Sequence, residues 1–192
     1  MWWFYTVVLG MSFGQILQEL AVAVREWSRE PGRRPFGPAV LWQFFLLVLV
    51  VQVWLAVTYY RGTVTEVSIP ELVAFLCVPA GILIMSFLLP ESRHDPEPAG
   101  ALPPPAAFDR VRPVFFGVLI AMVAVNLLHG VLIGQQGWDT DLLFQAMIIG
   151  GAVVGLFLRT TTADMVLATA MIAVVITYIG VGYSTVTVDG VT

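Results

Sequence analysis

Two groups of polar side chains interrupt long apolar stretches of this sequence. Gln15, Gln18 and Glu19 follow an i, i+3, i+4 pattern, and Asn126 and His129 are three residues apart, so each group shares one face of a helix. Amide, carboxylate and imidazole groups can bind an ion or relay a proton, and lipid excludes such groups unless they are paired or functional. We therefore expect these five residues to line a polar path between their two helices.

Two further carboxylates, Glu71 and Asp164, stand at the starts of apolar stretches. In the first turn of a helix, a carboxylate accepts the free backbone N–H groups and meets the positive end of the helix dipole. The pattern therefore favours capping for both residues, with a place in the functional site as the alternative. The polar path has its own alternative, since Gln and Asn often join packed helices in lipid. For His129, a structural hydrogen bond is that alternative.

The composition indicates a chain that lies in lipid. Of its 192 residues, 58% are hydrophobic and only 11% are charged, whereas a soluble domain carries about 25% charged residues. Unbroken apolar runs of roughly 20 residues can cross a bilayer, and their lack of alternation selects helices over a barrel. The sequence therefore predicts an all-α integral membrane protein with six transmembrane helices, at residues 2–24, 40–60, 69–89, 114–133, 142–158 and 165–183.

A proline-rich stretch divides the predicted helices into two groups of three. Residues 91–113 are predicted to be a cytoplasmic linker between residues 1–90 and residues 114–192. Because each half has an odd number of spans, the second half is inverted relative to the first, and the pattern allows two inverted repeats, as in secondary transporters. Sliding the first predicted helix onto the fourth sets Gln15 against Asn126, which supports such a repeat.

The basic residues predict how the chain is oriented. All nine are arginine, and eight of them fall in or beside the first, third and fifth loops, while Arg61 alone falls on the other side. Positively charged loops stay in the cytoplasm, so these three loops are predicted to be cytoplasmic and both termini to lie outside. We expect a multi-pass protein of the cell inner membrane.

Glycine spacing predicts surfaces where helices meet. Gly10 and Gly14, and again Gly151 and Gly155, are four residues apart, which lets two helices approach closely. Both pairs are therefore candidate contact faces of a homo-oligomer. The sequence shows no metal-binding, nucleotide-binding or nucleophile motif, so we expect no metal, no cofactor and no nucleic-acid partner, and an enzyme is the least favoured class.

Several short stretches carry a resemblance to other membrane proteins. They follow a glycine-dotted first helix, and they are Val51-Gln52-Val53-Trp54, Leu88-Leu89-Pro90, Arg112-Pro113-Val114-Phe115-Phe116-Gly117 and Asp141-Leu142-Leu143-Phe144-Gln145. In this order the chain resembles a group of uncharacterised bacterial six-helix inner-membrane proteins of about this length. The resemblance implies a membrane fold and location and carries no activity with it.

Two functions remain open from the sequence. The leading hypothesis is a small channel or secondary transporter for an ion or small solute, with the polar path between the first and fourth helices. The alternative is a non-catalytic membrane subunit, sensor or scaffold that packs against partner proteins through its glycine faces. A hydrated cavity between the two polar faces favours the first hypothesis. Polar groups that are paired with separate neighbours favour the second.

The predicted orientation can be tested with an impermeant thiol reagent in intact cells. Cysteines introduced near Arg33 and Pro104 should stay unlabelled because the arginine-rich loops are cytoplasmic. A cysteine near Thr63 should react, since that loop is predicted to lie outside. Labelling near Pro104 together with protection near Thr63 would reverse the orientation.

Overall fold

The computed structural model describes residues 2–29, 37–61, 69–89, 103–132 and 140–182. Within these ranges the chain forms six α-helices and no strand, which confirms the all-helical prediction. The helices are α1 (Trp2–Arg29), α2 (Gly37–Arg61), α3 (Ile69–Leu88), α4 (Pro104–Leu132), α5 (Thr140–Phe157) and α6 (Thr161–Gly182).

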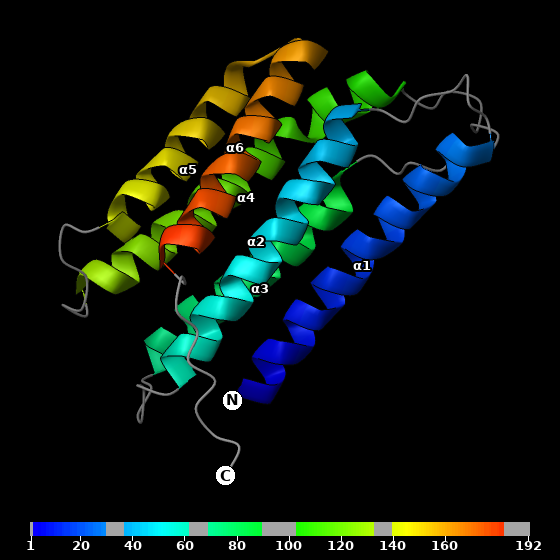
Figure 1. The fold of residues 1–192 in the computed structure, drawn as a ribbon. Helices are drawn as coiled ribbons and strands as arrows, with labels where there is room; N and C mark the ends of the chain where they lie inside the picture. Colours follow the sequence, from blue (N-terminus) through cyan, green and yellow to red (C-terminus); the bar gives the residue numbers. More distant parts are fainter. Residues whose placement is uncertain (1, 30–36, 62–68, 90–102, 133–139, 183–192) are drawn as a thin grey trace.

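The helices lie side by side and run in alternating directions (Figure 1). α2 packs on α6 and α3 packs on α4, and these two contacts join the halves of the chain. α1 lies at one edge against α2 and α3, and α5 lies at the opposite edge against α4 and α6. The alternation places Arg25, Arg110, Arg112 and Arg159 at the same end of the bundle, which we call the arginine-rich end.

Among the described residues, four helices are long and apolar enough to cross a membrane: α1, α2, α4 and α6. The apolar parts of α3 and α5, Leu72–Leu88 and Asp141–Phe157, are shorter than the other four. The fold is therefore compatible with a membrane protein, and the predicted number of six spans is not confirmed.

The start of α4 corrects the predicted linker. Residues 91–113 were expected to connect the halves without regular structure, but α4 begins at Pro104. Prolines fit the first turn of a helix because their missing N–H groups have no intrahelical partner there. The first backbone bond, from the Ala107 N–H to the Pro103 carbonyl at 2.9 Å, closes the turn around Pro104 and Pro105. The fully buried Phe108 then holds this extra segment against the bundle.

The helix packing does not confirm the predicted inverted repeat. A two-fold axis between the halves equates α1 with α4, so α4 should occupy the edge position of its half. Instead, the edge positions belong to α1 and α5, and α4 packs centrally against α3 and α5. The contact between α1 and α3 also lacks its counterpart, since α4 with α6 is not a principal packed pair of the described helices.

Aromatic side chains fill the interior near the arginine-rich end. Trp42 of α2 is fully buried, with ring centroids 5.4 Å from Phe45 and Phe115 and 5.2 Å from Phe116. The rings meet edge to face, a geometry that adds to the free energy of burial. A Cβ atom on Gly155 would come within 3.0 Å of the Phe116 ring, so the ring occupies the space that a larger residue would need.

Polar side chains from α1 and α2 bind the backbone of α3. The Ser12 hydroxyl donates to the Val8 carbonyl at 3.0 Å and lies 3.3 Å from the Pro79 carbonyl of α3. The Gln43 amide of α2 donates to the Ser86 carbonyl at 3.4 Å. Pro79 lies inside α3, where proline removes one backbone bond and kinks a helix. Side-chain donors therefore bind α3 at this proline and again seven residues beyond it.

The packing at Gly155 predicts different effects of alanine at two glycines of α5. Gly155→Ala should lower the melting temperature in detergent by about 2–8 °C, because overpacking against Phe116 costs more than helix propensity gains. Gly150→Ala is the matched control, since nothing lies within 4 Å of its Cβ position. Its melting temperature should stay unchanged or rise. Equal behaviour of the two variants would contradict the packing described here.

Candidate functional site

The structure divides the predicted polar group of α1. Glu19 is buried, with 9% of its surface exposed, and it accepts a hydrogen bond from the Gln15 amide at 3.4 Å. Gln15 is half-buried beside it, while Gln18 is exposed on the outward face of α1. Two of the three residues therefore share one environment, and Gln18 lies in another.

The partners predicted on α4 are not brought to this pair by the principal helix contacts. α1 packs mainly on α2 and α3, and α4 packs mainly on α3 and α5. Asn126 is exposed. The side chains of His129 and Glu71 lie outside the described residues. The five-residue path therefore stays a prediction, of which the described residues bring together Gln15 and Glu19.

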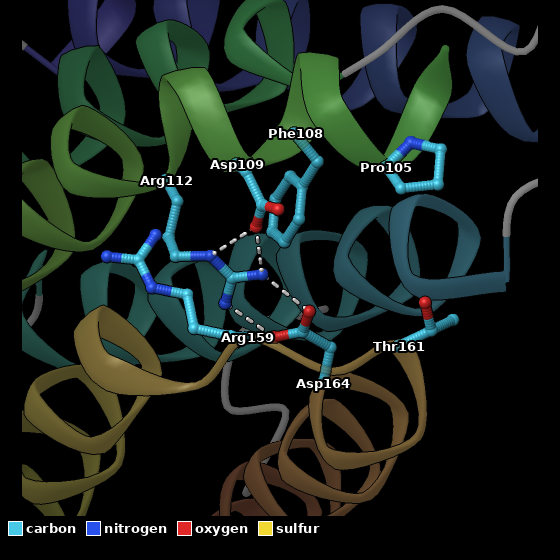
Figure 2. A pocket seen from close by; sticks show the side chains of 7 residues that line it. All are labelled: Pro105, Phe108, Asp109, Arg112, Arg159, Thr161 and Asp164. Carbon is cyan, nitrogen blue, oxygen red and sulfur yellow. Dashed lines mark hydrogen bonds and ion pairs between the residues drawn. The ribbon is translucent and has the colours of Figure 1, made fainter.

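A different polar cluster lies at the arginine-rich end, and Arg112 is its centre. Only 1% of Arg112 is exposed. Its two terminal nitrogens donate to the two oxygens of Asp164 at 2.6 Å each, a bidentate ion pair. Nε and Nη2 also donate to one oxygen of Asp109 at 3.1 and 2.9 Å. Nη1 reaches the Gly155 carbonyl at 3.1 Å. Figure 2 shows the guanidinium between the two carboxylates.

Residues of α4, α5 and α6 form this cluster. Asp109 and Arg112 are three residues apart on α4 and therefore neighbours on its surface. Gly155 lies in the last turn of α5, where helix carbonyls have no intrahelical donor. Asp164 lies in the first turn of α6. The Phe108 ring faces the guanidinium, with 4.8 Å between the Arg112 Cζ and the ring centroid, and adds a cation–π contact.

The position of Asp164 corrects its expected role as a helix cap. The Thr160 hydroxyl accepts the Ala163 N–H at 3.3 Å, and the Thr160 carbonyl accepts the Asp164 N–H at 3.0 Å. Thr160 is thus the residue that caps α6. The carboxylate of Asp164 is instead occupied by Arg112, because a buried guanidinium needs an opposite charge more than a helix end needs a second acceptor.

The space beside the cluster is small. A hollow of about 20 Å³ is lined by Pro105, Phe108, Asp109, Arg112, Arg159, Thr161 and Asp164, which is room for about one water molecule. The formal charges of the two arginines and the two aspartates cancel. The arrangement can fasten helix ends, and it offers a solute neither volume nor uncompensated charge.

A second polar cluster joins α5 and α6 at the opposite end of the bundle. The Tyr178 hydroxyl of α6 donates to one oxygen of Asp141, and the Gln145 amide donates to the other at 2.9 Å. The Tyr178 ring also packs on Phe144, with 4.9 Å between the centroids. Polar side chains thus link α6 to its neighbours at both ends.

Arg112 was not among the predicted site residues. Residues 91–113 were predicted to be a linker, so the charge of Arg112 was assigned to a loop. The available signal was the pair of Asp109 and Arg112 at i, i+3 spacing beside an apolar run. The other part of the signal was Asp164, an aspartate in the first turn of α6.

The donor set is unsuited to a metal ion. In the described part of the chain, no group of three or more His, Cys, Asp and Glu side chains could hold one. The two carboxylates that do come close together share an arginine, which already supplies the positive charge. The expectation that the chain has no cofactor stays a prediction.

Comparisons with known proteins do not assign the chain to a family. Neither the family models, nor the curated proteins, nor the solved structures contain a match to the chain.

The Arg112 cluster predicts a graded series of stability losses. Asp164→Asn should destabilise the protein by about 3–5 kcal/mol because it leaves a buried charge without its main partner. Asp109→Asn is the control, with an expected loss of about 1 kcal/mol or less, since the Asp109 side chain is 42% exposed. Thermal melting in detergent measures both.

A double variant tests whether the charges act as a pair. Arg112→Met combined with Asp164→Leu removes both charges and should regain much of the stability that Asp164→Asn loses, since apolar replacement of a buried pair is often close to neutral. Additive losses in the double variant would show that Arg112 and Asp164 do not depend on each other.

Proposed function

We propose that this chain is a multi-pass membrane protein that acts as a non-catalytic subunit or scaffold through contacts between helices in the bilayer. The distribution of side chains supports the membrane location. Large apolar residues face outward on the described helices, with Trp3 85% and Phe157 76% exposed. Arg112, Asp164 and Glu19 are buried instead. Such an exterior suits lipid as the solvent, while the buried charges of Arg112 and Asp164 satisfy each other.

The use of the polar side chains is the observation that carries the scaffold proposal. Ser12 and Gln43 reach carbonyls of α3, Arg112 binds Asp164, and Tyr178 binds Asp141. Each of these contacts joins two helices. The pairs differ, since α1 and α2 are joined to α3, α4 is joined to α6, and α5 is joined to α6. A permeation path needs polar groups that converge on a common space, whereas a scaffold needs them to fix the arrangement of helices that it presents to a partner.

A small channel or secondary transporter for an ion or small solute is the second candidate. It is favoured by Glu19, a carboxylate buried within an apolar helix beside Gln15. A carboxylate at membrane depth is costly and often marks a site for ions or protons. In this proposal Gln18, Asn126 and His129 complete the path, and two inverted halves alternate their access.

The membrane and the orientation belong to the proposal as well. We place the chain in a cell inner membrane with the arginine-rich end in the cytoplasm and both termini outside, because basic loops are retained on the cytoplasmic side. The resemblance to uncharacterised bacterial six-helix inner-membrane proteins agrees with this placement and stays a prediction.

Flux measurements on proteoliposomes decide between the two candidates. Wild-type protein, the Glu19→Gln variant and protein-free vesicles are compared for the flux of protons and of common monovalent ions. The scaffold proposal expects all three preparations to behave alike, with the variant within about 1 kcal/mol of wild-type stability, the value of one hydrogen bond. Wild-type flux that Glu19→Gln abolishes without loss of folding would replace the scaffold with the transporter.

A further inference from the structure

The outward face of α1 differs from the other exposed helix faces of the described structure. Val7, Gly10, Gly14, Gln18 and Ala21 follow one another at spacings of three or four residues, and all five are exposed. Nothing lies within 4 Å of the Cβ positions of Gly10 and Gly14. This row of residues, which we call the α1 outer face, is a shallow strip that a second helix can approach closely.

Gln18 makes the α1 outer face more than a strip of small residues. It lies within one turn of the middle of the span Trp3–Ser28, and its amide makes no hydrogen bond in the described structure. In hydrocarbon no water is available to satisfy such a group, and an unpaired polar group costs free energy. The amide therefore requires a hydrogen-bonding group from outside the chain, at the same depth and on the same face.

We infer that the α1 outer face binds a second copy of this chain, in a parallel two-fold dimer in which the two Gln18 amides meet. This inference rests on the proposed function and names the partner of its surface. Copies inserted with the same orientation are related by an axis along the membrane normal, so each residue of the face meets its own counterpart. A glutamine amide both donates and accepts hydrogen bonds, and two of them can satisfy each other.

The spacing along α1 suits such a dimer. Helices with glycines four residues apart cross closely at those glycines, and Gln18 lies one turn beyond Gly14, about 6 Å along the axis. At that distance from the crossing point the two helices have diverged by only a few ångströms, which glutamine side chains can span. A copy supplies the matching amide by symmetry, and an unrelated helix would need one at the same depth by chance.

Other glycines of the chain do not offer the same combination. Gly151 and Gly155 were expected to form a second oligomer face, but their Cβ positions meet Met171 and Phe116 inside the fold. Gly117, Gly150 and Gly180 are open as well, yet apolar residues surround the first two and no amide lies beside the third. On α6, the hydroxyls of Thr169 and Thr177 donate to carbonyls of their own helix. The α1 outer face is where open glycines and an unpaired amide coincide.

Disulfide cross-linking in native membranes tests the interface directly. In a Cys77→Ala background, single cysteines replace Gly10, Gly14 or the off-face control Phe13, which is also exposed, and a mild oxidant is added. We expect covalent dimers of twice the chain mass for Gly10→Cys and Gly14→Cys, and at least about tenfold less for Phe13→Cys. Equal cross-linking at all three positions, or at none, would overturn the α1 interface.

Two substitutions and a matched control test which residues carry the affinity. Gly14→Ile should abolish the dimer measured by donor–acceptor energy transfer between labelled full-length chains in vesicles, because its side chain separates the helices. Gln18→Leu should weaken the dimer by about 3- to 30-fold, the range of one or two hydrogen bonds in lipid. Gly117→Ile is the control, since it places the same side chain on another open face and should leave the dimer unchanged.

The outcomes separate this inference from the proposed function. A chain that stays monomeric in vesicles, yet inserts and conducts no ions, contradicts the dimer and leaves the scaffold proposal standing. Cross-linking of Gly14→Cys to a protein of different mass contradicts the second copy as the occupant. Ion flux that depends on Glu19 overturns the scaffold, whether or not the dimer forms.

Discussion

The bidentate contact between Arg112 and Asp164, at 2.6 Å for both hydrogen bonds, joins α4 to α6 inside the bundle. A guanidinium removed from water is tolerated only when carboxylates or carbonyls surround it. Supplying these partners fixes the ends of three helices: α4 must begin early enough to present Asp109, α5 must end with a free carbonyl at Gly155, and α6 must begin with Asp164 turned inward. The arrangement of the second half depends on this contact.

Different kinds of contact hold the helices together within each half of the chain. Charged groups and a tyrosine link α4, α5 and α6. Single donors from Ser12 and Gln43 bind carbonyls of α3 in the first half. α1 therefore remains at the edge of the bundle with one side uncovered, and this uncovered side is the one that carries Gly10, Gly14 and Gln18. An edge helix with such a surface is well placed to contact another protein.

Apolar run length was sufficient to predict six helices, because a helix that lies in lipid must be apolar over its whole length. It failed at the start of α4, since Pro104 and Pro105 interrupt hydropathy while fitting a first helical turn. The helical spacing correctly placed Gln15 and Glu19 near each other. It did not show the direction in which Gln18 points. That direction depends on which neighbours pack against α1, and the partner of Arg112 lies 52 residues away. Neither can be obtained from local spacing.

That separation has a consequence for synthesis. Arg112 is synthesised 52 residues before Asp164, so this part of α4 is made before its main counter-ion. Asp109, one turn earlier on the same helix, is the carboxylate available at that moment. Its moderate exposure in the finished fold suits a temporary partner. The Arg112 cluster is therefore complete only when α6 packs on the bundle, which makes the docking of the last helix the step that closes the second half.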